Sequence, residues 1–281
     1  MADLTTIILT YNEERNIANA INSVKKLAKR IVVVDSFSTD KTIEIAKSLG
    51  AEIIEHEFEN QAKQFIYAIN HLKIDTQWIM RLDADEIISK KASKEIEEIC
   101  FFNKDTDING IVVRFEVNFL GKKLRHGGIY PFKKMIIYKK NKGYMEDRAM
   151  DEHIVLNEGK SIELKHDSYH RDYKDLNAWI DKHNKYSSRE VEDYFLNNNQ
   201  ESKQLNKSAK IKRFIKFKIY YKLPLGTRAH LYYLYRYYFK FGFLDGKEGK
   251  IFAFMQAYWY RFLVDAKIFE KTKMINERKI E

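Results

Sequence analysis

The feature that most constrains this chain is a regular alternation of short apolar runs and amphipathic segments through its first 86 residues. Four runs have the length and composition of buried strands, and they occupy residues 5–9, 31–34, 51–54 and 77–80. Between them, apolar residues recur every three or four positions, as in helices, over residues 17–28, 43–49 and 61–72. This alternation predicts βαβ units with right-handed crossovers and a mostly parallel sheet.

After Gly110 the pattern changes. Strand-like segments at residues 111–119 and 135–138 predict an antiparallel extension of the sheet. From residue 173 to 196 the apolar spacing becomes helical again. The fold class expected is therefore α/β: a mostly parallel sheet with an antiparallel extension, followed by a helical C-terminal region.

The charge distribution divides the chain into two parts. Residues 201–281 carry 19 Lys and Arg against 7 Asp and Glu, a net charge of +12, whereas the preceding residues carry a net charge of −2. The same segment holds 19 of the 39 aromatic residues. Two regions with different roles are the simplest interpretation. We expect a sheet domain over residues 1–170 and a helical, basic and aromatic region over residues 171–281.

Composition and motifs exclude several classes of protein. The single cysteine, Cys100, leaves no disulfide framework and no multi-thiolate metal site within the chain. Neither the Gly-rich dinucleotide fingerprint nor the Gly-x-x-x-x-Gly-Lys phosphate loop occurs. The first residues do not resemble a secretory signal, and no apolar run is long enough to span a bilayer. These features favour a cytoplasmic protein.

Polar clusters follow three of the predicted strands, at residues 10–13, 35–36 and 83–85. In an open α/β sheet, ligands bind outside the carboxyl ends of the strands, where loops and helix N-termini gather. We therefore expect the three clusters to converge in space and to line a nucleotide-binding crevice.

The third cluster contains two carboxylates, Asp83 and Asp85, at positions i and i+2 of an extended segment. Such side chains leave the backbone on the same side, an arrangement that suits a hard divalent cation bound together with substrate phosphates. By itself an Asp-x-Asp is more often a solvated acidic turn. Its place after a buried strand, beside other polar strand ends, favours a metal site. Glu86 is expected to hold the loop by accepting backbone hydrogen bonds.

Three segments, in this order, resemble the successive motifs of family 2 glycosyltransferases: Ile8-Leu-Thr-Tyr-Asn-Glu13, Val34-Asp-Ser-Phe-Ser-Thr-Asp-Lys-Thr42 and Trp78-Ile-Met-Arg-Leu-Asp-Ala-Asp-Glu86. The resemblance covers about the first 155 residues. It implies the GT-A fold, an inverting reaction and a nucleotide-sugar donor, with a UDP-sugar expected. A weaker similarity through residues 182–186 and 242–247 extends to bacterial enzymes that build lipopolysaccharide core, O-antigen or capsule.

The resemblance also implies roles for individual residues. The residues that it implies bind the donor are Thr10, Tyr11, Glu13 and Asp35, and Asp35 would contact the nucleotide base. Asp83 and Asp85 would bind a divalent metal (Mn²⁺ or Mg²⁺), and Asp83 would also contact the donor. The family's general base, a carboxylate in an acidic pair, corresponds to Glu152, with Asp151 as the alternative because the order of the pair is reversed here. Such a base takes the proton of the acceptor hydroxyl.

Two further assignments are weaker. Some GT-A enzymes use a late histidine as a metal ligand, and His166 is the best candidate among His126, His153, His166 and His170. A histidine with a purely structural role remains the favoured alternative. Arg125, followed by two glycines, is a candidate for a flexible loop that contacts the donor or acceptor.

The basic, aromatic region has three interpretations: nucleic-acid binding, association with an anionic membrane surface, or a helical bundle with a solvated charged face. We favour the membrane interface and expect no nucleic acid, because no nucleic-acid motif accompanies the charge. The function expected is a glycosyltransferase acting on a lipid-linked glycan at the inner face of the plasma membrane. A nucleotidyltransferase, or a non-catalytic adaptor on the same fold, is the alternative.

Overall fold

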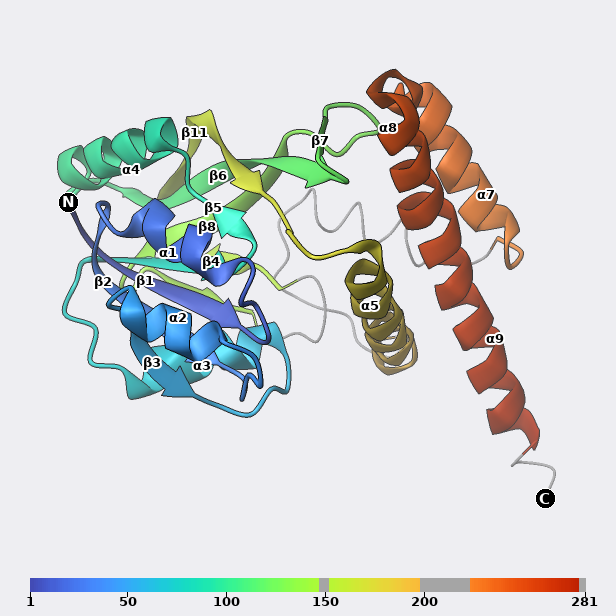
Figure 1. The fold of residues 1–281 in the computed structure, drawn as a ribbon, viewed down its shortest axis with the longest axis horizontal. Helices are drawn as coiled ribbons and strands as arrows, with labels where there is room; N and C mark the ends of the chain where they lie inside the picture. The colour runs from blue at the N-terminus through green and yellow to red at the C-terminus, as the bar shows by residue number, and fades with distance from the viewer. Residues whose placement is uncertain (147–151, 198–222, 278–281) are drawn as a thin grey trace. The chain divides into compact units, whose positions relative to one another are not determined.

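The computed structural model describes residues 1–146, 152–197 and 223–277 (Figure 1). The chain forms two compact units. Met1–Lys123 with Ile129–Lys174 make the first, the sheet unit, and Leu124–Gly128 with Asp175–Glu281 make the second, the helical unit. The boundary expected from the sequence lay between residues 170 and 171. The structure differs in one further respect, because the loop 124–128 belongs to the helical unit.

The sheet unit contains a nine-stranded mixed sheet in which β7 pairs with β6 and the other strands follow the order β3-β2-β1-β4-β8-β6-β11-β5. The first four strands along the chain pair in parallel, and they are β1 (Ala2–Thr10), β2 (Ala28–Asp35), β3 (Glu52–Glu55) and β4 (Trp78–Asp83). The other strands are β5 (Glu86–Ile87), β6 (Ile108–Phe119), β7 (Lys122–Leu124), β8 (Phe132–Lys139) and β11 (Lys160–His170). Strand β8 is antiparallel to both β4 and β6, which confirms the predicted antiparallel extension.

Helices cover both faces of this sheet because its central strands are apolar on both sides. Along β1, Leu4 and Ile8 belong to one core cluster and Ile7 and Leu9 to the other, as the two-residue period of a strand requires. Residues of α1 (Ile17–Val24), α2 (Thr42–Ser48) and α4 (Lys90–Phe102) complete the first cluster. Residues of α3 (Gln61–His71) and of the hairpin β9 (Gly143–Met145)–β10 (Ile154–Leu156) complete the second.

The local sequence explains where most helices and strands end, and the predicted end of helix α1 is wrong. Gly50 has a φ of +86° directly after α2, the conformation that favours glycine at a helix end. Helix α1, predicted to reach Ala28, ends at Val24. Ala28 instead begins β2 and pairs with Ala2, because the short turn that closes after Val24 returns the chain to the sheet at once.

The helical unit contains six helical segments among its described residues. They are α5 (Leu176–Asn197), α7 (Thr227–Leu234), the π-helix η3 (Tyr235–Phe239), α8 (Gly246–Phe252), η5 (Ala253–Trp259) and α9 (Tyr260–Glu277), with a short 3₁₀ turn η4 (Gly242–Asp245). A core of Val191, Tyr260, Val264 and Ile268 joins α5 to α9. Residues 201–222 of the basic, aromatic region lie outside the described residues. In the described part of the chain, none of the helices combines the length and apolarity that a bilayer crossing requires.

Candidate functional site

The register of the parallel strands brings the three polar clusters together. Thr10 on β1 pairs with Asp35 on β2, and Leu9 pairs with Asp83 on β4. Neighbouring strands lie about 4.8 Å apart, so the ends of β1, β2 and β4 form one continuous edge. The convergence predicted from the sequence is therefore confirmed.

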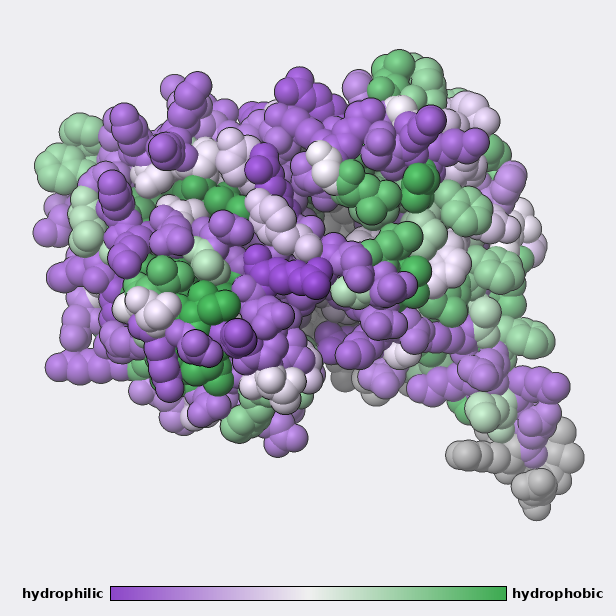
Figure 2. Space-filling view, viewed as in Figure 1, coloured by the Kyte–Doolittle hydropathy of each residue, from purple (hydrophilic) through white to green (hydrophobic). Residues whose placement is uncertain are grey.

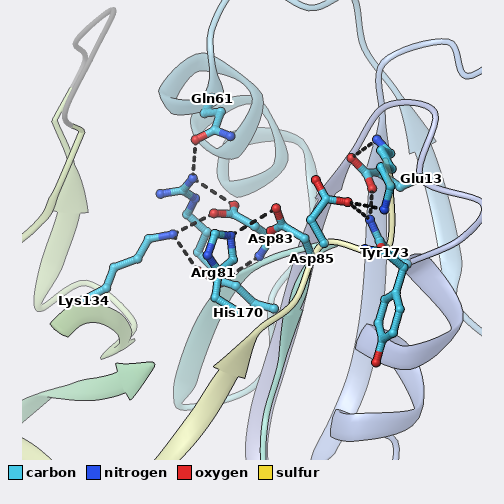
Figure 3. Close-up of polar contacts among 12 residues, drawn as sticks. Glu13, Gln61, Arg81, Asp83, Asp85, Lys134, His170 and Tyr173 are labelled. Carbon is cyan, nitrogen blue, oxygen red and sulfur yellow. Dashed lines mark hydrogen bonds and ion pairs between the residues drawn. The ribbon is translucent and has the colours of Figure 1, made fainter. Parts of the chain in front are cut away.

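Asp83 is held by two cations (Figure 3). The Arg81 guanidinium donates to its Oδ1 at 3.0 Å, and Lys134 Nζ, from β8, lies 2.7 Å from its Oδ2. Gln61, at the start of α3, accepts a further hydrogen bond of 2.7 Å from Arg81. Burial opposes ionisation of Asp83, but the charges of Arg81 and Lys134 outweigh burial and lower the pKa of Asp83 to about 2.

Glu86 closes the acidic loop. Its Oε2 accepts the backbone N–H of Asp83 at 3.0 Å, and Lys134 Nζ lies 3.1 Å from its Oε1. The backbone hydrogen bond matches the loop-holding role expected from the sequence. Burial raises the pKa of Glu86 despite the adjacent Lys134. Lys134 thus bridges two buried carboxylates that belong to the same turn.

Asp85 has a histidine beside it (Figure 3). His170 Nε2, at the end of β11, lies 3.1 Å from Asp85 Oδ2. Two ligand atoms about 2.1 Å from one cation in octahedral geometry lie about 3 Å apart, so this pair fits two neighbouring positions around a divalent metal. Within the described residues, no group of three or more His, Cys, Asp or Glu side chains forms a metal site made of protein alone. Substrate phosphates and water commonly supply further ligands to a divalent cation held by one or two protein side chains.

His166, the histidine predicted as a metal ligand, has another partner. Its Nδ1 lies 2.9 Å from Oε2 of Glu95 on α4, and its backbone N–H also donates to that carboxylate. His166 precedes His170 by four residues on β11, roughly 13 Å in an extended strand. The structure therefore places His170 and not His166 beside the acidic pair, because only the end of β11 reaches β5 next to Asp85.

The predicted donor-binding residues lie along the same edge in different environments. Asp35 is buried and accepts the backbone N–H and the hydroxyl of Ser38, each at 2.6 Å. Tyr11 is half exposed. Glu13 accepts from Asn16 and lies 2.6 Å from Lys174 Nζ, and burial raises its pKa while Lys174 opposes that rise. The contacts of Glu13 therefore serve to hold the loop after β1.

Two buried polar atoms at this edge have no hydrogen-bond partner within the described chain: the Thr10 hydroxyl and Arg81 Nε. A buried donor left unsatisfied costs about 1–3 kcal/mol. Thr10 is the last residue of β1, and Arg81 lies within β4, two residues before its end. A polar ligand or water at the site would remove this cost.

Glu152 lies close to the same cluster. Arg81, Asp83 and Lys134 all act electrostatically on its carboxylate, and burial raises its pKa above the usual range of a glutamate. In return, Glu152 contributes to the raised pKa of Arg81. The chain thus carries, near the acidic pair, a half-buried carboxylate whose affinity for a proton is raised. Asp151, the alternative base, lies outside the described residues.

Arg125 belongs to the helical unit, where its backbone N–H donates to the Asp245 carboxylate at 3.0 Å. The neighbouring His126 donates its own backbone N–H to the same carboxylate at 2.8 Å. These bonds fix the backbone of the loop that was expected to be flexible. A contact of Arg125 with the donor or acceptor stays a prediction.

Comparison with known proteins identifies the family. Residues 5–154 match the profile described as glycosyl transferase family 2, and this match covers more than half of the chain. The chain is a family 2 glycosyltransferase. The family inferred from the sequence motifs is thereby confirmed.

Relatives of this glycosyltransferase occur among bacteria. An uncharacterized glycosyltransferase of Rickettsia typhi is 30% identical over 96% of this chain and 88% of its own length. One of Rickettsia felis is 29% identical over 96% and 90%. Among solved structures, glucosyl-3-phosphoglycerate synthase from Mycobacterium tuberculosis, in complex with Mn²⁺, UDP and glucosyl-3-phosphoglycerate, aligns at 17% identity and a TM-score of 0.34. That alignment covers 42% of this chain and 44% of the synthase.

Sequence reasoning missed one functional candidate of this glycosyltransferase, Lys134, and preferred His166 to another, His170. Lys134 lies in a run of basic residues on an antiparallel strand, and only the pairing of β8 beside β4 shows that it faces Asp83. His170 was one of four candidate histidines, and the pairing of His170 with Glu86 between β11 and β5 distinguishes it.

Proposed function

We propose that this glycosyltransferase transfers a sugar, with inversion, from a nucleotide-sugar donor to a hydroxyl of a lipid-linked glycan in the synthesis of a bacterial cell-surface polysaccharide. One observation carries the proposal: a candidate cation site, Asp85 with His170, lies in the same strand-end cluster as a half-buried carboxylate of raised pKa, Glu152. A UDP-sugar is the donor we expect. The cluster's unsatisfied Thr10 hydroxyl and Arg81 Nε support a polar ligand.

The donor would lie along the carboxyl ends of β1, β2 and β4. Asp35 has further acceptor capacity beyond its two bonds to Ser38, because a carboxylate offers about four lone-pair sites. It is therefore suited to receive an N–H of the nucleotide base. Thr10 provides a hydroxyl for the nucleotide, and the exposed ring of Tyr11 provides a surface against which a base can pack.

Asp85 and His170 would hold a divalent cation, Mn²⁺ or Mg²⁺. Such a cation neutralises the charge that develops on the leaving diphosphate. Asp83 was expected to be a direct ligand as well, but both of its oxygens lie in ion pairs with Arg81 and Lys134. We propose that Asp83 contributes by fixing these two cations beside the diphosphate.

Glu152 would act as the general base. Its raised pKa, caused by burial, makes the carboxylate a better proton acceptor than an exposed glutamate. It would take the proton from the acceptor hydroxyl as that oxygen attacks the anomeric carbon. The nearby Arg81 and Lys134 oppose this rise, because their positive charges favour the ionised carboxylate.

A thermal-shift screen of UDP-, GDP- and TDP-sugars, each with and without Mn²⁺, tests donor and metal together. Binding to the native state raises the melting temperature, so a UDP-sugar should stabilise the protein only when Mn²⁺ is present. His170→Ala and Asp85→Ala should remove the Mn²⁺-dependent part of the shift. His166→Ala is the matched control, because it lies on the same strand, and it should keep the full shift. Equal shifts for all four proteins would overturn the metal assignment.

The acceptor and the location rest on the helical region. We propose that residues 171–281 bring the enzyme to the anionic inner face of the plasma membrane, where a lipid-linked acceptor is presented. The concentration of positive charge and aromatic residues in this region supports the proposal. Transfer to a lipid-linked acceptor in vesicles should exceed transfer to a soluble acceptor of the same sugar structure. Equal rates on the two acceptors would contradict a lipid-linked substrate.

A further inference from the structure

The helical unit exposes a dense group of large apolar side chains at one turn. We infer that this turn, between η3 and η4, is the surface that enters the headgroup region of an anionic bilayer. Its members are Phe239, Phe241, Phe243 and Leu244, and they are called the aromatic turn below. This inference rests on the membrane association proposed above and assigns it to particular side chains.

The aromatic turn is far more exposed than apolar side chains usually are. Phe239 is 74% exposed, Leu244 58%, Phe241 56% and Phe243 44%. In Figure 2 hydrophobic side chains gather over α7 and α8 of this unit. Soluble monomers rarely leave contiguous apolar surface of this kind unless it serves binding.

The backbone beneath the aromatic turn is firmly held. Arg236 Nε donates to the carbonyl of Gly127 at 2.8 Å, and the N–H of Gly127 donates to the carbonyl of Lys240 at 2.8 Å. Asp245, buried at the end of η4, accepts the backbone N–H groups of Arg125 and His126. A buried polar network on both sides of the turn therefore keeps the apolar side chains outward, where they cannot collapse onto the unit's own core.

Positive charge flanks the aromatic turn. Lys240, Lys247 and Lys250 are all exposed. Of the two acids in the same stretch, Asp245 is buried and hydrogen-bonded, and Glu248 is half-buried. Aromatic side chains with lysines around them are the composition of a membrane-interface anchor, since the rings enter the headgroup region and the ammonium groups bind anionic lipid.

A second copy of the chain is a poorer partner for this surface. A twofold dimer through the aromatic turn would bring the same patch of each protomer together. The three lysines of one copy would then lie near those of the other, and like charges repel. A bilayer containing anionic lipid instead offers charge of the opposite sign. Charge complementarity therefore selects the membrane.

Sedimentation of the full-length protein with lipid vesicles tests the inference. One set of vesicles contains phosphatidylcholine alone, and the other contains phosphatidylcholine with about one-third phosphatidylglycerol. The wild-type protein should pellet with the second set and be released as salt rises, since screening shortens the reach of the lysine charges. The double variant Phe239→Ser/Leu244→Ser should lower the partition coefficient about tenfold or more. The triple variant Lys240→Gln/Lys247→Gln/Lys250→Gln should do the same for anionic vesicles only.

Matched controls come from α4 of the sheet unit, which exposes side chains of the same types. Phe101→Ser/Phe102→Ser and Lys90→Gln/Lys91→Gln/Lys94→Gln remove equally exposed groups and should leave vesicle binding unchanged. Melting curves of every variant establish that it is folded.

Three outcomes would overturn the inference. The first is that the double variant and the triple variant both bind anionic vesicles as well as the wild-type protein does. The second is that the wild-type protein itself does not bind them. The third is a wild-type dimer that Phe239→Ser/Leu244→Ser converts to a monomer, since the turn would then bind a second copy. Metal-dependent donor binding, measured separately, tests the enzymatic proposal independently of these results.

Discussion

The two units of this protein use buried charge differently. In the helical unit, two sets of buried charged groups are matched: Arg228 pairs with Asp265, and Glu190 accepts from Tyr260 and Arg261. In the sheet unit, four carboxylates gather at one edge, namely Asp83, Asp85, Glu86 and Glu152. Two cations, Arg81 and Lys134, and one histidine, His170, lie among them.

The matched charges of the helical unit stabilise its fold, whereas the charges of the strand-end cluster are suited to binding a ligand. Matched pairs leave no excess of either sign, and their energy depends on both partners being present. The strand-end cluster has more acids than permanent cations, shifted pKa values and unsatisfied donors, which is the pattern of a site completed by a ligand. The predictions below test whether the two kinds of charge can be altered separately.

The largest effect on stability is expected at the matched pair. Arg228 and Asp265 are 3% and 2% exposed, so Arg228→Met would leave an uncompensated buried carboxylate and lower the free energy of unfolding by about 3–5 kcal/mol. Urea denaturation measures this loss. The double variant Arg228→Met/Asp265→Leu should recover most of it. A loss of Mn²⁺-dependent donor binding in the folded double variant would break the distinction between the units.

Glu152→Gln should have the largest effect on catalysis, lowering kcat about 10²- to 10⁴-fold while donor affinity stays unchanged, because the amide cannot accept the proton. Glu152 has a raised pKa, so its basic form is lost as the pH falls through that value. Wild-type kcat should therefore decline on the acid side, and the variant should lack this decline. Glu158→Gln, an exposed neighbour, is the control for a pH–rate profile. A large loss in Asp151→Asn alone would instead assign the base to Asp151.

Asp83 should make the stability of the protein depend on pH in the acid range. Its pKa is lowered to about 2 from 3.8, so its contribution is complete above pH 3.8 and is lost as the pH falls toward 2. This lowering of the pKa corresponds to a contribution of about 2 kcal/mol to the free energy of unfolding. Urea denaturation between pH 5 and 2 should show a steeper decline for the wild-type protein than for Asp83→Asn. Parallel curves would mean that the ion pairs with Arg81 and Lys134 do not stabilise the fold.

The smallest effect is expected from Asp35→Asn. A contact to the nucleotide base is made equally in the ground and transition states, so the donor KM should rise about tenfold while kcat at saturating donor is kept. Ser38→Ala removes one hydrogen bond to Asp35 but leaves the carboxylate, and it should change the KM less. Steady-state kinetics with varied donor measures both variants, and an unchanged KM in Asp35→Asn would exclude the base contact.

The sequence by itself determined the parallel half of the fold and the place of the site. Short apolar runs and three-to-four spacing are local signals, and they correctly predicted β1 to β4 with α1 to α3 between them. The polar residues after these strands, with Asp83 and Asp85 among them, had to converge because parallel strands end at one edge. The motif order also predicted the family correctly.

Only the tertiary structure decided which side chains meet the acidic pair. Lys134, Glu152 and His170 come from segments 50 to 85 residues further along the chain, and their proximity depends on the order and register of β8, β11 and β5, which no local pattern encodes. For the same reason His166 and His170 look equivalent in the sequence, although strand pairing puts just one of them beside Asp85. The two-residue period of a strand fixes the face of a residue, but pairing between distant strands fixes its neighbours.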